Sequence, residues 1–132
     1  MSEEHGFLKG LAGVVADATS VSQVQGDVGR LIYRGISIEE LAEKSTYEEC
    51  AYFSLYGKMP TQNELNKFTF EMKASRVLPK TVEAVIAAAP RSAHPMSILQ
   101  AAISAIGFEE HPVNLKNEEM NIHSATKIIS QL

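Results

Sequence analysis

The sequence is poor in several features that would mark a particular class of protein. Its 132 residues include one cysteine and no tryptophan, and only 7% are aromatic. A single cysteine excludes an internal disulfide framework and favours a reducing compartment. A formal net charge of −4 argues against a basic surface for nucleic acid or membrane lipids. The N-terminus is acidic and no apolar run follows it, so we expect a cytoplasmic protein without a targeting signal.

The composition that remains is that of an ordinary globular domain. Hydrophobic residues make up 45% of the chain and charged residues 21%. A chain of this length is able to bury a sizeable core. The longest charge-free run, residues 92–108, is slightly short for a membrane span and contains polar residues. We therefore expect this run to be buried in protein.

The N-terminal third of the sequence predicts a small β-hairpin. Strand-forming residues before and after Gly26–Gly29 predict that residues 19–25 pair with residues 30–34. We divide the chain into a tail over residues 1–9, a β-hairpin region over residues 10–35 and a helical part over residues 36–132. Arg30 and Arg34 lie in the hairpin region, and the sequence does not settle whether either binds an anion or only forms the corner before the first helix.

The rest of the sequence predicts helices with clear start signals. Capping boxes, in which Ser or Thr and a Glu three residues later satisfy each other's free amides, are expected at Ser37, Ser45 and Thr61. They predict helices ending near Lys44, at Gly57 and before Leu78–Pro79. Three further helices are expected over residues 82–89, 95–107 and from Asn117 to the end. The last one ends without a stop signal, so we expect it to be cut within the element.

Few residues suggest chemistry. The four histidines have no metal-like spacing with Cys or carboxylates, so neither a metal site nor a cofactor is expected, and no catalytic residue is assigned. His5 and His111 are interpreted as surface residues, His94 as a helix cap and His123 as a residue beside the last helix's apolar face. Cys50 is interpreted as a small buried hydrophobe.

The charge-free helix is the strongest clue to a partner. Such a helix must be covered on nearly all sides, and short helices in a chain of this size have difficulty doing so. A subunit interface would cover it, and the candidate interface residues are Ile98, Leu99, Ala102 and Ile106.

The order of the motifs resembles the citrate synthase family, which comprises citrate and 2-methylcitrate synthases. The motifs that carry the resemblance are residues 10–16 (Gly-Leu-Ala-Gly-Val-Val-Ala), 30–35 (Arg-Leu-Ile-Tyr-Arg-Gly) with 37–42, 47–49 leading to 55–61 (Leu-Tyr-Gly-Lys-Met-Pro-Thr), 78–79, 93–96 (Ala-His-Pro-Met) and 101–107. Ile36 and Met59 depart from the family pattern, which commonly has Tyr and Leu there.

The resemblance implies a mostly α fold, the helical large-domain portion of such an enzyme with a small N-terminal hairpin. It also implies an obligate dimer that condenses oxaloacetate with acetyl-CoA or propionyl-CoA, using an Asp base, two His and several Arg. The family motifs that carry these groups, such as His-Gly-Gly-Ala-Asn, do not occur in this sequence. We therefore expect the N-terminal part of an enzyme, inactive alone, with oxaloacetate and acyl-CoA bound only through a missing C-terminal portion. Its expected partner is a second copy of the chain or a complementary subunit. The alternative is a non-catalytic helical module that associates with a full-length synthase.

Overall fold

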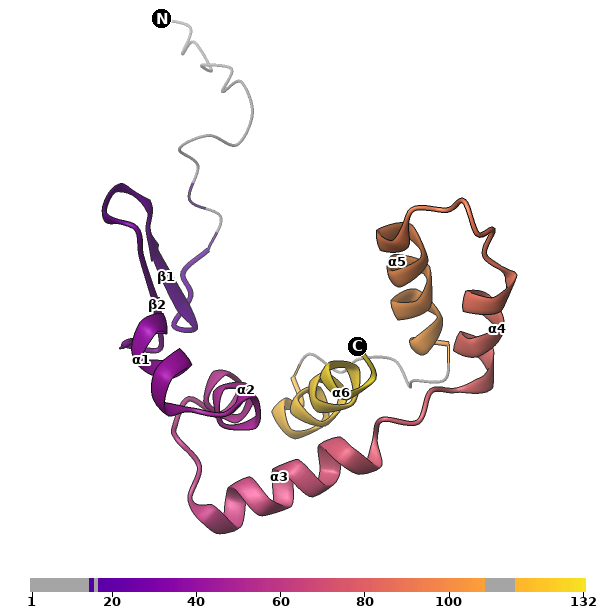
Figure 1. Ribbon diagram of the computed structural model, residues 1–132. Helices are drawn as coiled ribbons and strands as arrows, with labels where there is room; N and C mark the ends of the chain where they lie inside the picture. Colours follow the sequence, from indigo (N-terminus) through magenta and orange to yellow (C-terminus); the bar gives the residue numbers. More distant parts are fainter. Residues whose placement is uncertain (1–14, 16, 109–115) are drawn as a thin grey trace, which may run out of the picture. The chain divides into compact units, whose positions relative to one another are not determined.

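The computed structural model describes residue 15 and residues 17–108 and 116–132, and these residues fall into two compact units. One unit lies within Met1–Lys44 and the other is Ser45–Leu132. Figure 1 shows the elements of both units in chain order. The expected tail over residues 1–9 lies outside the described residues, as do His5 and His111.

The first unit is built on a three-stranded antiparallel sheet with strand order β1-β2-β3. Strand β1 (Ser22–Gln25) pairs with β2 (Arg30–Tyr33) in a register that places Val24 opposite Leu31. The chain turns between them through a 3-10 turn, Gly26–Val28, and Gly29 with φ 65. The predicted hairpin is confirmed.

The third strand is an element that the sequence did not predict. Strand β3 (Ile36–Ser37) pairs antiparallel with β2, so that Ile36 lies opposite Tyr33. The two residues between the strands both have positive φ, 44 for Arg34 and 92 for Gly35. Such a two-residue turn matches the twist of antiparallel strands. Gly35 supplies the positive φ expected at this corner, and Arg34 adopts one as well.

Helix α1 (Ile38–Lys44) follows the sheet, and α2 (Tyr47–Tyr56) opens the second unit. The box at Ser37 is only half formed: its hydroxyl accepts from the Glu40 amide at 3.3 Å, whereas the Glu40 carboxylate pairs with Lys44. The box predicted at Ser45 is wrong by one residue. Thr46 is the N-cap of α2 and pairs with Glu49, because Thr46 carries the extended backbone that the cap requires.

Helix α3 (Gln62–Ala74) begins at the predicted Thr61 box. The Thr61 amide donates to the Glu64 carboxylate at 2.8 Å, and the Thr61 hydroxyl accepts from the Glu64 amide. Before it, Gly57 ends α2 in the left-handed conformation with φ 77, as predicted. Both boundaries therefore follow from local chemistry alone.

Three more helices complete the second unit: α4 (Lys80–Ala88), α5 (Pro95–Ile106) and α6 (Glu118–Gln131). The His94 ring nitrogen Nδ1 accepts from the Met96 amide at 3.2 Å, and Pro95 follows as the first helical residue. Asn117 caps α6 through its Oδ1, which accepts from the Met120 amide. The capping roles expected for His94 and Asn117 are thus confirmed.

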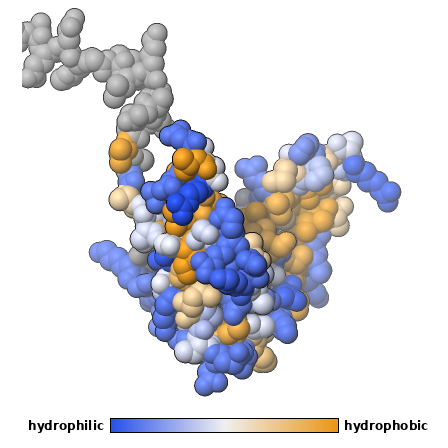
Figure 2. Space-filling model, turned by 60° about the vertical axis from the view of Figure 1, so that its left-hand side comes forward, coloured by the Kyte–Doolittle hydropathy of each residue, from blue (hydrophilic) through white to orange (hydrophobic). Residues whose placement is uncertain are grey.

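Two apolar clusters hold the described part of the second unit. Helices α4 and α5 pack side by side (Figure 1), and Val82 lies against Ala102, Ala105 and Ile106. The second cluster joins α2, α3 and α6 through Tyr52, Phe68 and Met72, with Ile129 of α6 against them. Elsewhere apolar side chains remain on the surface, and the face in Figure 2 shows them among polar ones.

No helix in the described part of the chain is long and apolar enough to cross a membrane.

Candidate functional site

An aromatic cluster forms the floor of a cavity in the second unit. Tyr52 and Tyr56 are four residues apart on α2 and therefore lie on the same face of the helix. Their rings stack with centroids 4.2 Å apart and planes 19° apart. Phe68 of α3 meets Tyr52 edge-on at 5.4 Å and Tyr56 at 6.3 Å. Tyr52 and Phe68 are buried, whereas Tyr56 is 41% exposed and presents its ring to the opening.

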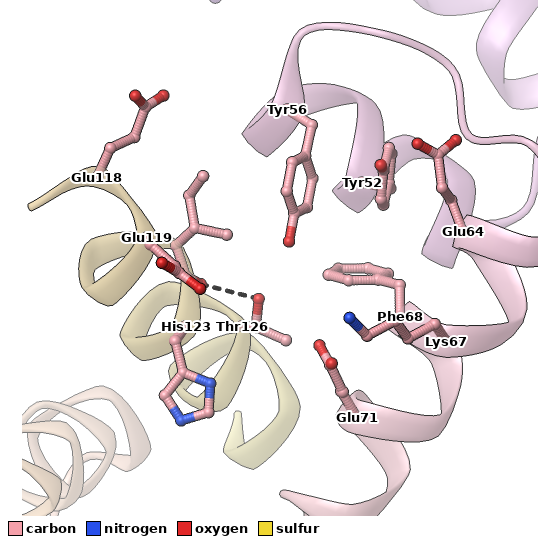
Figure 3. Close-up of a pocket in the computed structure, with 11 residues that line it drawn as sticks. Tyr52, Tyr56, Glu64, Lys67, Phe68, Glu71, Glu118, Glu119, His123 and Thr126 are labelled. Atoms are coloured by element: carbon pink, nitrogen blue, oxygen red, sulfur yellow. Dashed lines mark hydrogen bonds between the residues drawn. The ribbon is translucent and has the colours of Figure 1, made fainter.

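The cavity has a volume of about 580 Å³ and lies between α2, α3 and α6 (Figure 3). Helix α3 adds Glu64, Lys67 and Glu71 to its wall. Helix α6 adds the residues of its first three turns: Glu118, Glu119, Ile122, His123 and Thr126. Thr126 is buried, and its hydroxyl donates to the Ile122 carbonyl at 2.9 Å. The wall is therefore acidic and the floor aromatic.

Burial and the nearby carboxylates raise the pKa values of the two tyrosines. Burial raises the pKa of Tyr56, and the charges of Glu71 and Glu119 raise it further. The pKa of Tyr52 is raised chiefly by burial and then by Glu64. A negative charge near a phenol opposes its ionisation. Negative potential from α3 and from α6 therefore meets at the Tyr56 hydroxyl.

Glu64 differs from the other carboxylates because it has close donors. The Lys58 ammonium lies 2.6 Å from Glu64 Oε1, and the Thr61 amide and hydroxyl donate to Oε2. These contacts, that from Lys58 first, lower the pKa of Glu64 to about 2. Glu64 therefore stays ionised and serves the helix start, which removes it from acid–base chemistry near neutral pH.

The candidate interface residues on α5 do not share one environment. Ala102 and Ile106 are 7% and 4% exposed, because they pack against Val82 of α4. Ile98 is half-buried, and Leu99 is 38% exposed. Helix α4 therefore covers residues in the second half of the charge-free helix, whereas Met96 and Leu99, in its first half, keep exposed apolar side chains. A role for these residues in a dimer stays a prediction.

The two arginines of the hairpin region lie apart from the cavity residues in the chain, in the first unit. Arg30 is exposed at the start of β2, and its charge makes the smallest contribution to the lowered pKa of Glu39, after hydrogen bonds from the Glu39 backbone and Ser37. Arg34 occupies the positive-φ turn. Cys50 is half-buried on α2 and is a free thiol.

Sequence reasoning missed the cavity, although one local signal was available. The spacing of Tyr52 and Tyr56 predicts a stacked pair on one helix face, whereas nothing local predicts that α6 brings its acidic first turn near them. His123, placed in the sequence beside an apolar face, lines this cavity and is exposed. Within the described residues no three His, Cys, Asp or Glu side chains are arranged to hold a metal ion.

The architecture defines a class: mostly helical proteins with a small antiparallel sheet and well-capped short helices. The family model described as citrate synthase, C-terminal domain, matches residues 10–132. Citrate synthase from Synechocystis sp. is 41% identical over 108 residues, which is 82% of this chain and 27% of that protein. The 2-methylcitrate synthase from Mycobacterium tuberculosis is 36% identical over 83% of this chain and 28% of its own length.

A solved structure agrees with these matches. The ternary complex of citrate synthase from Thermoplasma acidophilum with carboxymethyl coenzyme A and oxaloacetate has a TM-score of 0.82 and 28% identity, covering 90% of this chain and 31% of that one. The chain belongs to the citrate synthase family. It spans about a quarter to a third of the length of these relatives.

Proposed function

We propose that this chain is the N-terminal portion of a citrate synthase-type acyltransferase that condenses oxaloacetate with acetyl-CoA or propionyl-CoA, and that it is inactive alone. One observation carries the proposal: the family match extends over residues 10–132, yet the chain spans only 27% of the Synechocystis relative. The matched family model is described as a C-terminal domain, but the family's later catalytic motifs are not in this sequence. Their absence supports the N-terminal placement.

The chemistry of the reaction supports inactivity of the isolated chain. Condensation needs a base that removes a proton next to the thioester and donors that stabilise the enol and the ketone. Of the cavity carboxylates, Glu64 is committed to Lys58 and Thr61. The nitrogen Nδ1 of His94 accepts the Met96 amide as a helix cap. These residues serve the fold, and the reacting groups belong to the portion of the enzyme beyond this chain.

The acyl-CoA substrate and the oligomeric state of the complete enzyme are part of the same proposal. A citrate synthase and a 2-methylcitrate synthase resemble this chain at 41% and 36% identity, so both acyl groups remain candidates. The complete enzyme is proposed to be a cytoplasmic homodimer of the tricarboxylic acid or methylcitrate cycle. The exposed apolar side chains of Met96 and Leu99 in the first half of α5 support an additional contact there.

A segment exchange tests the proposal. A chimera in which this chain replaces the matched segment of the Synechocystis citrate synthase is expected to release thiol from acetyl-CoA in the presence of oxaloacetate. The control is the same chimera with oxaloacetate omitted. A folded chimera without turnover would contradict the proposal.

The alternative is a non-catalytic helical module that binds a full-length synthase. The first half of α5, with its exposed Met96 and Leu99, would then dock on that enzyme. The two functions are separated by the DNA downstream of codon 132: an open frame with the His and Asp motifs supports the enzyme portion, and its absence supports the module.

A further inference from the structure

We propose that the cavity between α2, α3 and α6 receives a cationic side chain, an arginine or lysine, from the part of the enzyme that lies beyond these 132 residues. The source of that side chain rests on the proposed function. The preference of the cavity for a cation does not, because it follows from the described residues.

The charges of the cavity favour a cation. Glu64 is already paired with Lys58, so Glu71, Glu118 and Glu119 remain against the single ammonium of Lys67. Three carboxylates and one ammonium leave two net negative charges on the wall. The negative charges of Glu71 and Glu119 also raise the pKa of the Tyr56 hydroxyl, so they act on the aromatic cluster at the opening of the cavity.

The aromatic floor adds a second preference for a cation. The faces of Tyr and Phe rings attract guanidinium and ammonium groups. Tyr56 is held by its stack on Tyr52 and yet is 41% exposed, so part of the aromatic cluster remains open. Figure 3 shows Tyr56 reaching down from α2 toward the end groups of Lys67 and Glu71 on α3. A planar guanidinium that enters there meets aromatic carbon and carboxylate oxygen together.

The relatives contain long stretches of polypeptide outside the matched segment, and these stretches are the proposed source of the cation. The chain covers 27% of the Synechocystis protein and 31% of the Thermoplasma protein, so most of each relative's polypeptide is available to cover this surface. At about 580 Å³ the opening has room for a long side chain and its flanking residues. A buried cation would then be paired, as buried charges in proteins are.

The direct test uses N-acetyl-arginine methylamide as the probe and N-acetyl-citrulline methylamide as its neutral counterpart. At low salt, NMR of the aromatic rings is expected to show saturable shifts at Tyr56 and Phe68 with the arginine probe only. The double variant E71Q/E119Q is expected to bind about tenfold more weakly, from two exposed charge pairs lost. E83Q, in the first turn of α4, is the matched control and should leave binding unchanged.

Removing the internal cation gives a result of opposite sign. Lys67→Met should tighten binding of the arginine probe severalfold, because Lys67 competes for the same carboxylates. Weaker binding in this variant, equal binding of the citrulline probe or preferential binding of N-acetyl-glutamate would overturn the assignment.

The chimera separates the failure of this inference from that of the proposed function. In the chimera, E71Q/E119Q is expected to lower the urea midpoint of unfolding, and E83Q to leave it unchanged. An active chimera whose midpoint does not respond would overturn the cation site and leave the proposed function standing. A folded, inactive chimera whose midpoint still falls would do the reverse.

Discussion

At the scale of single residues, the Glu64 carboxylate is held at the start of α3 by Lys58 and Thr61. Its pKa lies at about 2, below the ordinary 4.5, chiefly because of Lys58 and then Thr61. A carboxylate with a lowered pKa in the folded state stabilises the fold above its unfolded pKa, and this stabilisation is lost as the pH falls toward the folded pKa. The ion pair at Glu64 therefore stabilises the turn before α3 in a pH-dependent way.

Glu64→Gln tests this pH-dependent stabilisation. At neutral pH the variant is expected to unfold at lower urea concentration than the parent chain. The difference between the two should shrink as the pH falls from about 5 to about 2, where the parent carboxylate also becomes protonated. Urea midpoints measured across this range check the prediction, with Glu83→Gln as the control. A difference that stays constant through the window would contradict it.

Gly35 is a residue whose role follows from its backbone alone. Its φ of 92 is one that residues with a side chain rarely adopt, although an added Cβ would meet nothing within 4 Å. Gly35→Ala is therefore expected to destabilise the sheet by about 1 kcal/mol through backbone strain. Gly26→Ala is the matched control, since Gly26 also has open space but no positive φ. Hydrogen exchange at the amides of β2 measures the effect, and equal protection in both variants would refute it.

At the scale of elements, the α4–α5 pair depends on one small apolar contact surface. Val82 is 1% exposed and lies against Ala102, Ala105 and Ile106. Val82→Ala is expected to cost about 2 kcal/mol of the free energy of unfolding, because the cavity it leaves cannot fully collapse. Val77→Ala makes the same chemical change at a side chain that is 80% exposed and should cost little. Urea unfolding curves compare the two, and similar losses would speak against this packing.

The exposed apolar side chains in the first half of α5 make a separate prediction. Met96 and Leu99 are 62% and 38% exposed, in contrast to the buried Ala102 and Ile106 in its second half. Because exposed apolar patches drive association, we expect the isolated chain to self-associate. Leu99→Glu should shift it toward the monomer in sedimentation experiments, without unfolding it. A parent chain that is monomeric and melts cooperatively would contradict this account.

The elements show what local sequence is able to predict. The helix starts at Thr61, His94 and Asn117 were predictable because a cap is satisfied within four residues of its own position. The displaced cap at Thr46 shows the limit of this reasoning, since Ser45 and Thr46 both precede suitable glutamates. Strand β3 was not predictable, because a strand of two residues is too short to show an alternation of apolar and polar side chains.

The cavity was beyond local reasoning for a different cause. Its floor joins Tyr52 to Phe68, and part of its wall comes from α6, which begins fifty residues after Phe68. Only tertiary packing brings these segments together. The same holds for α5: the sequence identified an apolar helix but not which of its residues α4 covers.

At the scale of the whole molecule, the fold and the chemistry are separable. The described residues form capped helices, a small sheet and two apolar clusters, and the family match extends over nearly the whole chain. The motifs that the resemblance assigns to catalysis, such as His-Gly-Gly-Ala-Asn, do not occur in these 132 residues. We therefore propose that this chain contributes part of the fold, and not the reacting groups, of a citrate synthase-type enzyme.

The most direct measurement is a thiol-release assay on the purified 132-residue chain, supplied with oxaloacetate and either acetyl-CoA or propionyl-CoA. We expect a rate no greater than that of the mixture without protein, while the chimera with the Synechocystis relative turns over under the same conditions. Oxaloacetate-dependent release of thiol by the isolated chain, proportional to its concentration, would contradict the account.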